Sequence, residues 1–223
     1  FTGAVTATTY NGIPFYSDSS AASLYTHDVS GTDNSAEANS AYGFNAMDSI
    51  TTGDNNTAIG YRAGGALTSG SSNVLIGKDA GDTLTTGTAN VAVGVDALQS
   101  EDDHGRNVAI GHSALETLNA GADAYNVAVG YTAGVAMTTG VQNVLLGGQA
   151  GDALTSANNN VAIGYNAMGS EDTGDGSTAV GHSALAAMNY DGYAHNTAIG
   201  YHAGKSVTTG IQNTILGGLA GDA

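Results

Sequence analysis

The sequence predicts an all-β protein, a parallel β-solenoid (β-roll or β-helix) of about eleven rungs that are 17 to 19 residues long. Three observations lead to this prediction. Asparagine recurs at a pitch of 17 or 19 residues, a glycine follows each of these positions by four residues, and an alanine follows each by seven. A short period kept this strictly is typical of a one-dimensional stack of similar units, not of a globule with a catalytic cleft.

The repeated asparagines and glycines define the rung. The asparagines are Asn39, Asn56, Asn73, Asn90, Asn107, Asn126, Asn143, Asn160, Asn196 and Asn213, with Ser177 in the remaining slot. The glycines are Gly43, Gly60, Gly77, Gly94, Gly111, Gly130, Gly147, Gly164, Gly181, Gly200 and Gly217. Residues 56–125 match residues 126–195 at an offset of 70, so each super-repeat holds three rungs of the shorter length and one of the longer.

Each rung is expected to start with a short strand after its asparagine, as in Val108, Ala109 and Ile110. Alternate residues of a strand point to opposite faces. We expect the first and third residues to fill the coil interior and the middle residue to face outward. Because a strand that is apolar on both faces is buried on both, the middle positions predict an inter-chain stripe against another copy of the chain. Its members are Ala58, Leu75, Ala92, Ala109, Ala128, Leu145, Ala162, Ala179, Ala198 and Ile215.

Other repeated residues indicate how the coil turns. The glycine at plus four predicts a left-handed conformation at a corner. The asparagines predict a ladder in which each side-chain amide bonds to backbone and to the asparagine of the next rung. A second segment carries leucine or methionine at plus eleven in many rungs and reaches turns of the T-T-G type, so we expect two or three strands per coil.

Two parts are expected along the chain, a lead-in or cap segment at residues 1–38 and a β-solenoid repeat domain at residues 39–223, with 70-residue super-repeats from residue 56. The asparagine–glycine pair at residues 11–12 predicts a tight turn. Open solenoid ends need covering, and the candidate capping aromatics are Tyr10, Phe15, Tyr16 and Tyr25. The last rung stops partway through its unit, which is expected of a piece of a longer protein.

Composition excludes several classes of partner and cofactor. The formal net charge is −16 and only four residues are basic, which argues against nucleic acid and against adsorption to anionic membranes. No run approaches the ~18 apolar residues of a membrane span, so no membrane insertion is expected. The chain has no cysteine, which excludes a disulfide framework and thiolate metal sites. No cofactor is predicted.

The motifs N-V-A-I-G, N-T-A-I-G and N-V-A-V-G resemble the head repeats of trimeric autotransporter adhesins, whose motif runs close to N-S-V-A-I-G. The longer form, N-T-A-I-G-Y-x-A-G followed by T-T-G-x-x-N, looks even more like repeats of bacteriophage tail-fibre proteins. The lead-in T-G-A-V-T-A-T-T-Y-N-G is similar to segments of such fibres. The resemblance of the repeats covers residues 39–223. It implies a parallel β-roll or β-helix that assembles as a homotrimer and projects from a virion or cell surface.

The 70-residue offset pairs two acidic loops, residues 101–104 (E-D-D-H) and residues 171–176 (E-D-T-G-D-G). Hard oxygen ligands in a glycine-rich turn could hold calcium. The loops lack the spacing of an EF-hand and its closing bidentate glutamate, so solvated loops are the favoured interpretation.

Aromatic residues recur after the corner glycine, at Phe44, Tyr61, Tyr131, Tyr165 and Tyr201. Exposed aromatics could stack on the sugar rings of a host glycan. Packing from rung to rung explains them as well, and it is the favoured interpretation.

The histidines do not predict catalysis. His112 precedes Ser113, and His182 precedes Ser183. A serine–histidine pair needs a third orienting group, and none stands at a sensible position. The other histidines lack zinc spacing, and no G-x-x-x-x-G-K-[ST] phosphate loop is present. No catalytic, cofactor-binding or metal residue is assigned, and an enzyme is not expected.

The leading functional hypothesis is a non-enzymatic structural fibre segment for host or surface attachment, namely a phage tail fibre. Its partners would be itself, as a homotrimer, and a host-surface glycan or protein receptor. Its location would be a virion tail fibre or an extracellular surface. The alternatives are a bacterial trimeric adhesin head, an ice-binding solenoid and a calcium-dependent solenoid.

Overall fold

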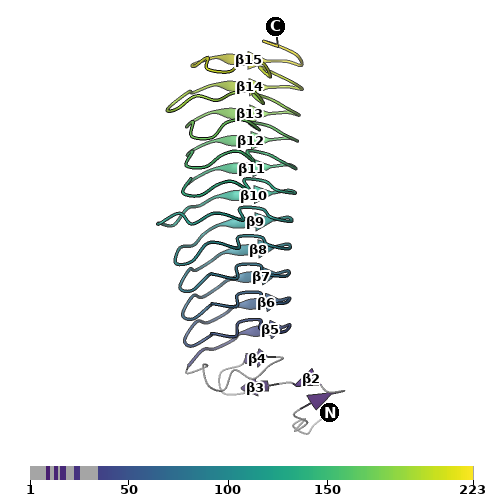
Figure 1. The fold of residues 1–223 in the computed structure, drawn as a ribbon, viewed down its shortest axis with the longest axis vertical. Helices are drawn as coiled ribbons and strands as arrows, with labels where there is room; N and C mark the ends of the chain where they lie inside the picture. Colours follow the sequence, from purple (N-terminus) through teal and green to yellow (C-terminus); the bar gives the residue numbers. More distant parts are fainter. Residues whose placement is uncertain (1–8, 11–12, 15, 19–22, 26–34, 223) are drawn as a thin grey trace.

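The computed structural model describes residues 9–10, 13–14, 16–18, 23–25 and 35–222. Residues 35–222 form a rod of stacked coils, with one short strand per coil aligned with the strands of the coils beside it (Figure 1). The described residues contain no helix. The structure therefore confirms the all-β solenoid and the rung length that the asparagine spacing predicts.

Eleven parallel strands of three residues each form the repeating sheet. They are β5 (Ser40–Tyr42), β6 (Thr57–Ile59), β7 (Val74–Ile76), β8 (Val91–Val93), β9 (Val108–Ile110), β10 (Val127–Val129), β11 (Val144–Leu146), β12 (Val161–Ile163), β13 (Thr178–Val180), β14 (Thr197–Ile199) and β15 (Thr214–Leu216). Spatial order follows sequence order, and pairing is in register, so Val91 lies between Val74 and Val108. Equivalent residues of successive rungs therefore form columns along the rod.

The lead-in segment extends this sheet. Strand β4 (Ser23–Tyr25) pairs in parallel with β5 and antiparallel with β3 (Tyr16–Asp18), while β1 (Thr9–Tyr10) and β2 (Ile13–Pro14) form a separate antiparallel pair. The predicted turn at residues 11–12 and the side chains of the predicted aromatic cap lie outside the described residues.

The expectation of two or three strands per coil is wrong for the described rungs, since each has one strand and completes its coil with turns. The reason is a left-handed backbone at three fixed positions of every rung besides the corner glycine, namely directly before the ladder position, at plus six and at plus eight. In the rung of Asn56 these residues are Asn55 (φ 59°), Arg62 (φ 55°) and Gly64 (φ 59°). A positive φ interrupts an extended chain, and these residues are mostly not glycine, so composition does not reveal them.

The predicted facing of the strand residues is also wrong. The middle residues fill the coil interior, and the first and third residues face outward. The proposed inter-chain residues Ala58, Leu75, Ala92, Ala109, Ala128, Leu145, Ala162, Ala179 and Ala198 are 0% exposed within a single chain, and Ile215 packs against the same core. They cannot form a surface between chains. A three-residue strand has one central side chain and two flanking ones on the opposite face, and the narrow interior accepts only the single central one.

Further columns complete the core. The alanines at plus seven are buried from Ala46 to Ala203, and the large residues at plus eleven, such as Leu67 and Met137, are also 0% exposed. These columns make the interior of the rod largely a stack of small and medium aliphatic side chains.

The asparagine ladder forms as the sequence predicts. The side-chain Oδ1 of Asn39 accepts the backbone N–H of Asn56 at 2.8 Å, and Asn56 Nδ2 donates to the carbonyl of Gly70 at 2.8 Å. In the slot that lacks asparagine, Ser177 Oγ accepts the N–H of Asn196 at 3.2 Å. Each buried amide thereby joins its own rung to the next.

The glycine at plus four has a positive φ in every rung, between 114° and 146°. Space requires it as well, because a Cβ on Gly60 would stand 2.4 Å from the carbonyl oxygen of Gly77 in the next rung. Corner glycines therefore allow the coils to stack closely.

Candidate functional site

The first surface feature is an uncharged strip of aliphatic residues and three threonines, here called the outward sheet face, formed by the first and third residues of β6 to β14. Its members are Thr57, Ile59, Val74, Ile76, Val91, Val93, Val108, Ile110, Val127, Val129, Val144, Leu146, Val161, Ile163, Thr178, Val180, Thr197 and Ile199. None is charged, and all are partly or fully exposed. Continuous exposed apolar surfaces are typical of interaction sites.

The second feature is a column of aromatic and imidazole rings at plus five, here called the ring column, which follows the corner glycine and is interrupted by Lys78, Val95 and Gly148. Phe44 and Tyr61 stack with centroids 6.4 Å apart, and His182 lies 5.3 Å from Tyr165 and 5.4 Å from Tyr201. Neighbouring rings thus cover part of each other's faces, which supports the interpretation that they pack from rung to rung.

The two serine–histidine pairs are hydrogen bonded within this column. Ser113 Oγ lies 2.9 Å from His112 Nδ1, and Ser183 Oγ lies 3.0 Å from His182 Nδ1. Both serines are 5% exposed, so their hydroxyls point away from solvent, where a substrate would arrive. The bond orients each imidazole among its neighbouring rings.

An open pocket of about 270 Å³ lies on the turns of successive rungs. It is lined by Asn45, Asp48, Ser49, Arg62, Gly65, Ala66, Asp82 and Thr83. Arg62 crosses it to reach Asp82 at 2.6 Å. Burial raises the pKa of Asp82, although the guanidinium of Arg62 opposes this. The ion pair ties two rungs together.

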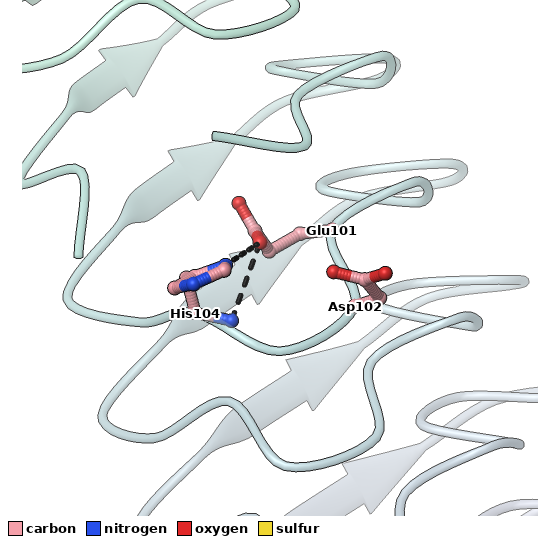
Figure 2. Close-up of side chains that lie close together, drawn as sticks. All are labelled: Glu101, Asp102 and His104. Carbon is pink, nitrogen blue, oxygen red and sulfur yellow. Dashed lines mark hydrogen bonds and ion pairs between the residues drawn. The ribbon is translucent and has the colours of Figure 1, made fainter. Parts of the chain in front are cut away.

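The first acidic loop brings three metal-ligating side chains together. One ligand atom each from Glu101, Asp102 and His104 lies within 4.8 Å of the others. Figure 2 shows the Glu101 carboxylate turned toward His104, whose Nδ1 is 3.6 Å and whose backbone N–H is 3.3 Å from Oε1. Burial raises the pKa of Glu101. Nitrogen and oxygen donors of this kind suit a divalent transition metal.

The second acidic loop repeats only part of this arrangement. Glu171 is 0% exposed like Glu101, and its Oε1 accepts the N–H of Gly174 at 2.8 Å. Gly174 stands where the first loop has His104, so the imidazole has no counterpart. Burial raises the pKa of Glu171. The feature common to both loops is a buried glutamate, not a set of metal ligands.

Pairing the two loops from their sequence was correct, but their buried glutamates were missed. Glu101 and Glu171 stand eleven residues after Asn90 and Asn160, in the column that other rungs fill with leucine or methionine. This position could have indicated that the two glutamates are buried and hydrogen bonded, because a charged residue in an aliphatic column needs a partner.

No protein-family model, no curated protein and no solved structure matches this chain. Among the described residues, no helix has the length and hydrophobicity to span a bilayer.

Proposed function

We propose that this chain is a non-enzymatic structural segment of an extracellular fibre, with a phage tail fibre as the leading candidate, and that it assembles as a homotrimer through the outward sheet face. The observation that carries the proposal is the continuous, uncharged outward sheet face on a chain whose net charge is −16. Its place on a virion or cell surface rests on the resemblance of the repeats to phage fibres and adhesin heads.

Self-association through this face follows from its chemistry and its period. Copies of an acidic protein repel one another unless they meet where charge is absent. Another copy also carries the same period, so side chains can match rung by rung along the rod. Three residues at ~3.3 Å by nine rungs at ~4.8 Å give a strip of about 430 Å² per chain. This is about half of the ~800 Å² per partner of a standard interface, and the rings at plus five add to it.

Rigidity along the rod suits a spacer. Successive rungs are joined by parallel strand pairing and by the asparagine ladder. For example, Asn56 Oδ1 accepts both the backbone N–H of Asn73 at 2.9 Å and the side-chain N–H of Asn73 at 3.0 Å. Bending the rod would break several such bonds at once. A receptor, whether glycan or protein, would then be held at a fixed distance from the particle.

An ice-binding function is disfavoured by the threonines of the T-T-G turns. Thr85 Oγ1 donates to the Asp102 carbonyl at 3.1 Å, and Thr138 Oγ1 donates to the Thr155 carbonyl at 3.3 Å. These hydroxyls serve the stacking of rungs. An adhesin head would use the same outward sheet face, so it remains an alternative of the same structural class.

The native mass tests the proposal. Light scattering on the full chain should give three times the 21.9 kDa of one chain. The variant Val108→Lys places a charge on the outward sheet face and should be a folded monomer by circular dichroism. Ala122→Lys adds the same charge on an exposed loop and should stay trimeric. A monomeric native chain, or a trimer unaffected by Val108→Lys, would overturn this assembly.

A further inference from the structure

Two rungs have a glutamate at plus eleven, where the other rungs have an aliphatic residue or methionine, and both of these rungs precede a longer rung. The buried residues there are aliphatic or methionine except for Glu101 and Glu171, which are also 0% exposed. Each glutamate lies in the rung directly before a 19-residue rung, residues 107–125 and 177–195 respectively. The coincidence of a buried acid with a change of rung length occurs twice, once in each super-repeat.

In the rungs of Asn56 and Asn126, each followed by a 17-residue rung, three backbone N–H groups of the turn share one backbone carbonyl of the next rung. The N–H groups of Thr68, Ser69 and Gly70 converge on the carbonyl oxygen of Thr85, at 2.9, 3.3 and 3.2 Å. The N–H groups of residues 138–140 converge on the Thr155 carbonyl in the same way. This arrangement needs a following turn of equal length, because the accepting carbonyl must lie directly above the three donors.

Before the first 19-residue rung, side chains replace the missing carbonyl. The N–H of His104 donates to Glu101 Oε1 at 3.3 Å, and the N–H of Asp103 donates to Asp102 Oδ1 at 2.7 Å. From the longer rung, the N–H of Ala120 turns back to Glu101 Oε2 at 3.4 Å. One carboxylate thus accepts donors from both rungs.

The second copy repeats this pattern with a different loop sequence. Glu171 Oε1 accepts the N–H of Gly174 at 2.8 Å and the N–H of Tyr190 at 3.4 Å. The N–H of Thr173 donates to Asp172 Oδ1 at 2.8 Å. Because Gly174 replaces His104, the histidine is not needed for the arrangement, whereas the glutamate is common to both.

We propose that Glu101 and Glu171 are length adaptors, whose side-chain carboxylates supply the hydrogen-bond acceptors that a longer following rung displaces. A leucine at this position would leave two N–H groups without an acceptor, which lowers the stability of the fold where such groups are shielded from water. The carboxylate has two oxygens and can accept from both rungs. The cost is burial of a charged group in the core.

The adaptors let the coil carry longer loops at every fourth rung without a break in the sheet. The coil between β9 and β10 reaches further from the rod than the coils before it (Figure 1). The two loops, residues 119–125 and 189–195, share only their first and sixth residues. Loop sequence can therefore vary while the coil beneath it stays the same.

A four-variant cycle on the full chain tests the proposal. One change replaces residues 101–104 with Leu-Thr-Thr-Gly, the sequence of residues 84–87. The other deletes Ala122 and Asp123, which shortens the following rung to the length of its neighbours. Each change alone should lower the melting temperature, and the two together should restore it. Effects that simply add would overturn the adaptor. Because the deletion removes the Arg106–Asp123 ion pair, Asp123→Ala serves as its control.

Amide hydrogen exchange on milder variants gives a second test that does not depend on how the deletions fold. In Glu101→Gln, one of the N–H groups of His104 and Ala120 faces an amide NH₂ instead of an oxygen, so its exchange should accelerate at least tenfold. In Glu171→Gln, the amide oxygen can take the place of Oε1 and serve both donors, so protection at Gly174 and Tyr190 should persist. Unchanged exchange in Glu101→Gln would contradict the proposed role.

Discussion

The Cδ1 methyl of Leu75 lies 2.7 Å from the point where a Cβ on Gly64 would stand. Leu75 is the inward residue of β7, and Gly64 is at plus eight in the rung before. The Cδ2 methyl of Leu75 fills the matching space beside Gly81, at 2.8 Å. In β8 and β9 the inward residue is alanine, and the plus-eight residues are Leu98 and Leu115. The two columns therefore exchange volume, so that a large residue in one faces a small residue in the other.

Gly64→Ala tests this exchange and should destabilise the chain by about 1–3 kcal/mol, the usual cost of overpacking a core. Backbone conformation does not explain the glycine, because Leu98 adopts φ 51° at the equivalent position where Gly64 has φ 59°. Chemical denaturation would measure the loss.

The double variant Gly64→Ala/Leu75→Ala separates steric crowding between positions 64 and 75 from backbone strain at position 64. It should be more stable than the sum of its two single variants, since the alanine occupies space that Leu75 leaves. Gly121→Ala is the control, because Gly121 has φ 68° and no atom within 4 Å of its Cβ position. An additive double variant would show that the two columns do not exchange volume.

Asn73→Ala should lower the free energy of unfolding by roughly 2–4 kcal/mol, since buried partners lose their hydrogen bonds. Asn73 Oδ1 accepts the N–H of Asn90 at 2.9 Å, and its Nδ2 donates to the Gly87 carbonyl at 2.9 Å. Asn73→Ser should cost less, because Ser177 shows that a hydroxyl can still accept the next rung's N–H. Equal losses in thermal unfolding of the two variants would contradict the ladder's contribution.

The sequence predicted the rung, the ladder and the corner glycines because each depends on a residue type with few alternatives. A buried amide with donor and acceptor groups is needed at Asn56, and only glycine fits at Gly60. The sequence did not predict which face of each strand is buried. Val108, Ala109 and Ile110 are all apolar, so the alternation of side chains along the strand does not show which of them face the interior. The pairing of Leu75 and Leu145 with nearby glycines was the informative signal, since size compensation occurs inside a core.

The turns and the adaptors were harder to predict. Arg62 and Asn55 adopt positive φ although their residue types do not require it, because hydrogen bonds to neighbouring rungs hold them there. The N–H of Arg62, for example, donates to the carbonyl of Phe44 at 3.0 Å. The role of Glu101 depends on the length of the following rung, which a residue-by-residue examination of the acidic loop does not consider.

Calcium addition or chelation should leave the melting temperature unchanged. The acidic oxygens of the first loop already accept hydrogen bonds: Asp103 Oδ1 accepts the hydroxyls of Thr85 at 2.6 Å and Thr86 at 3.2 Å, which lowers the pKa of Asp103. A calcium ion would have to displace such donors to gain the six or more oxygen ligands it prefers. Scanning calorimetry with calcium and with a chelator would check this. A rise in melting temperature with calcium that Asp103→Ala abolishes would support a calcium-dependent solenoid instead.

Glu171→Gln should be more stable than the native chain at neutral pH and equal to it in acid. Burial raises the pKa of Glu171 in the folded state, so the folded chain binds this proton more tightly than the unfolded chain. The stability that protonation contributes is therefore present below the unfolded pKa, and it is lost as the pH rises through the folded pKa. The neighbouring Asp172 carboxylate acts in the same direction, while the N–H groups of Gly174 and Tyr190 oppose it. Melting temperatures measured from pH 3 to pH 8 should diverge only in the upper range, with the exposed Glu37→Gln as a control for the lost charge. A constant difference across the range would show that the buried carboxylate does not titrate with folding.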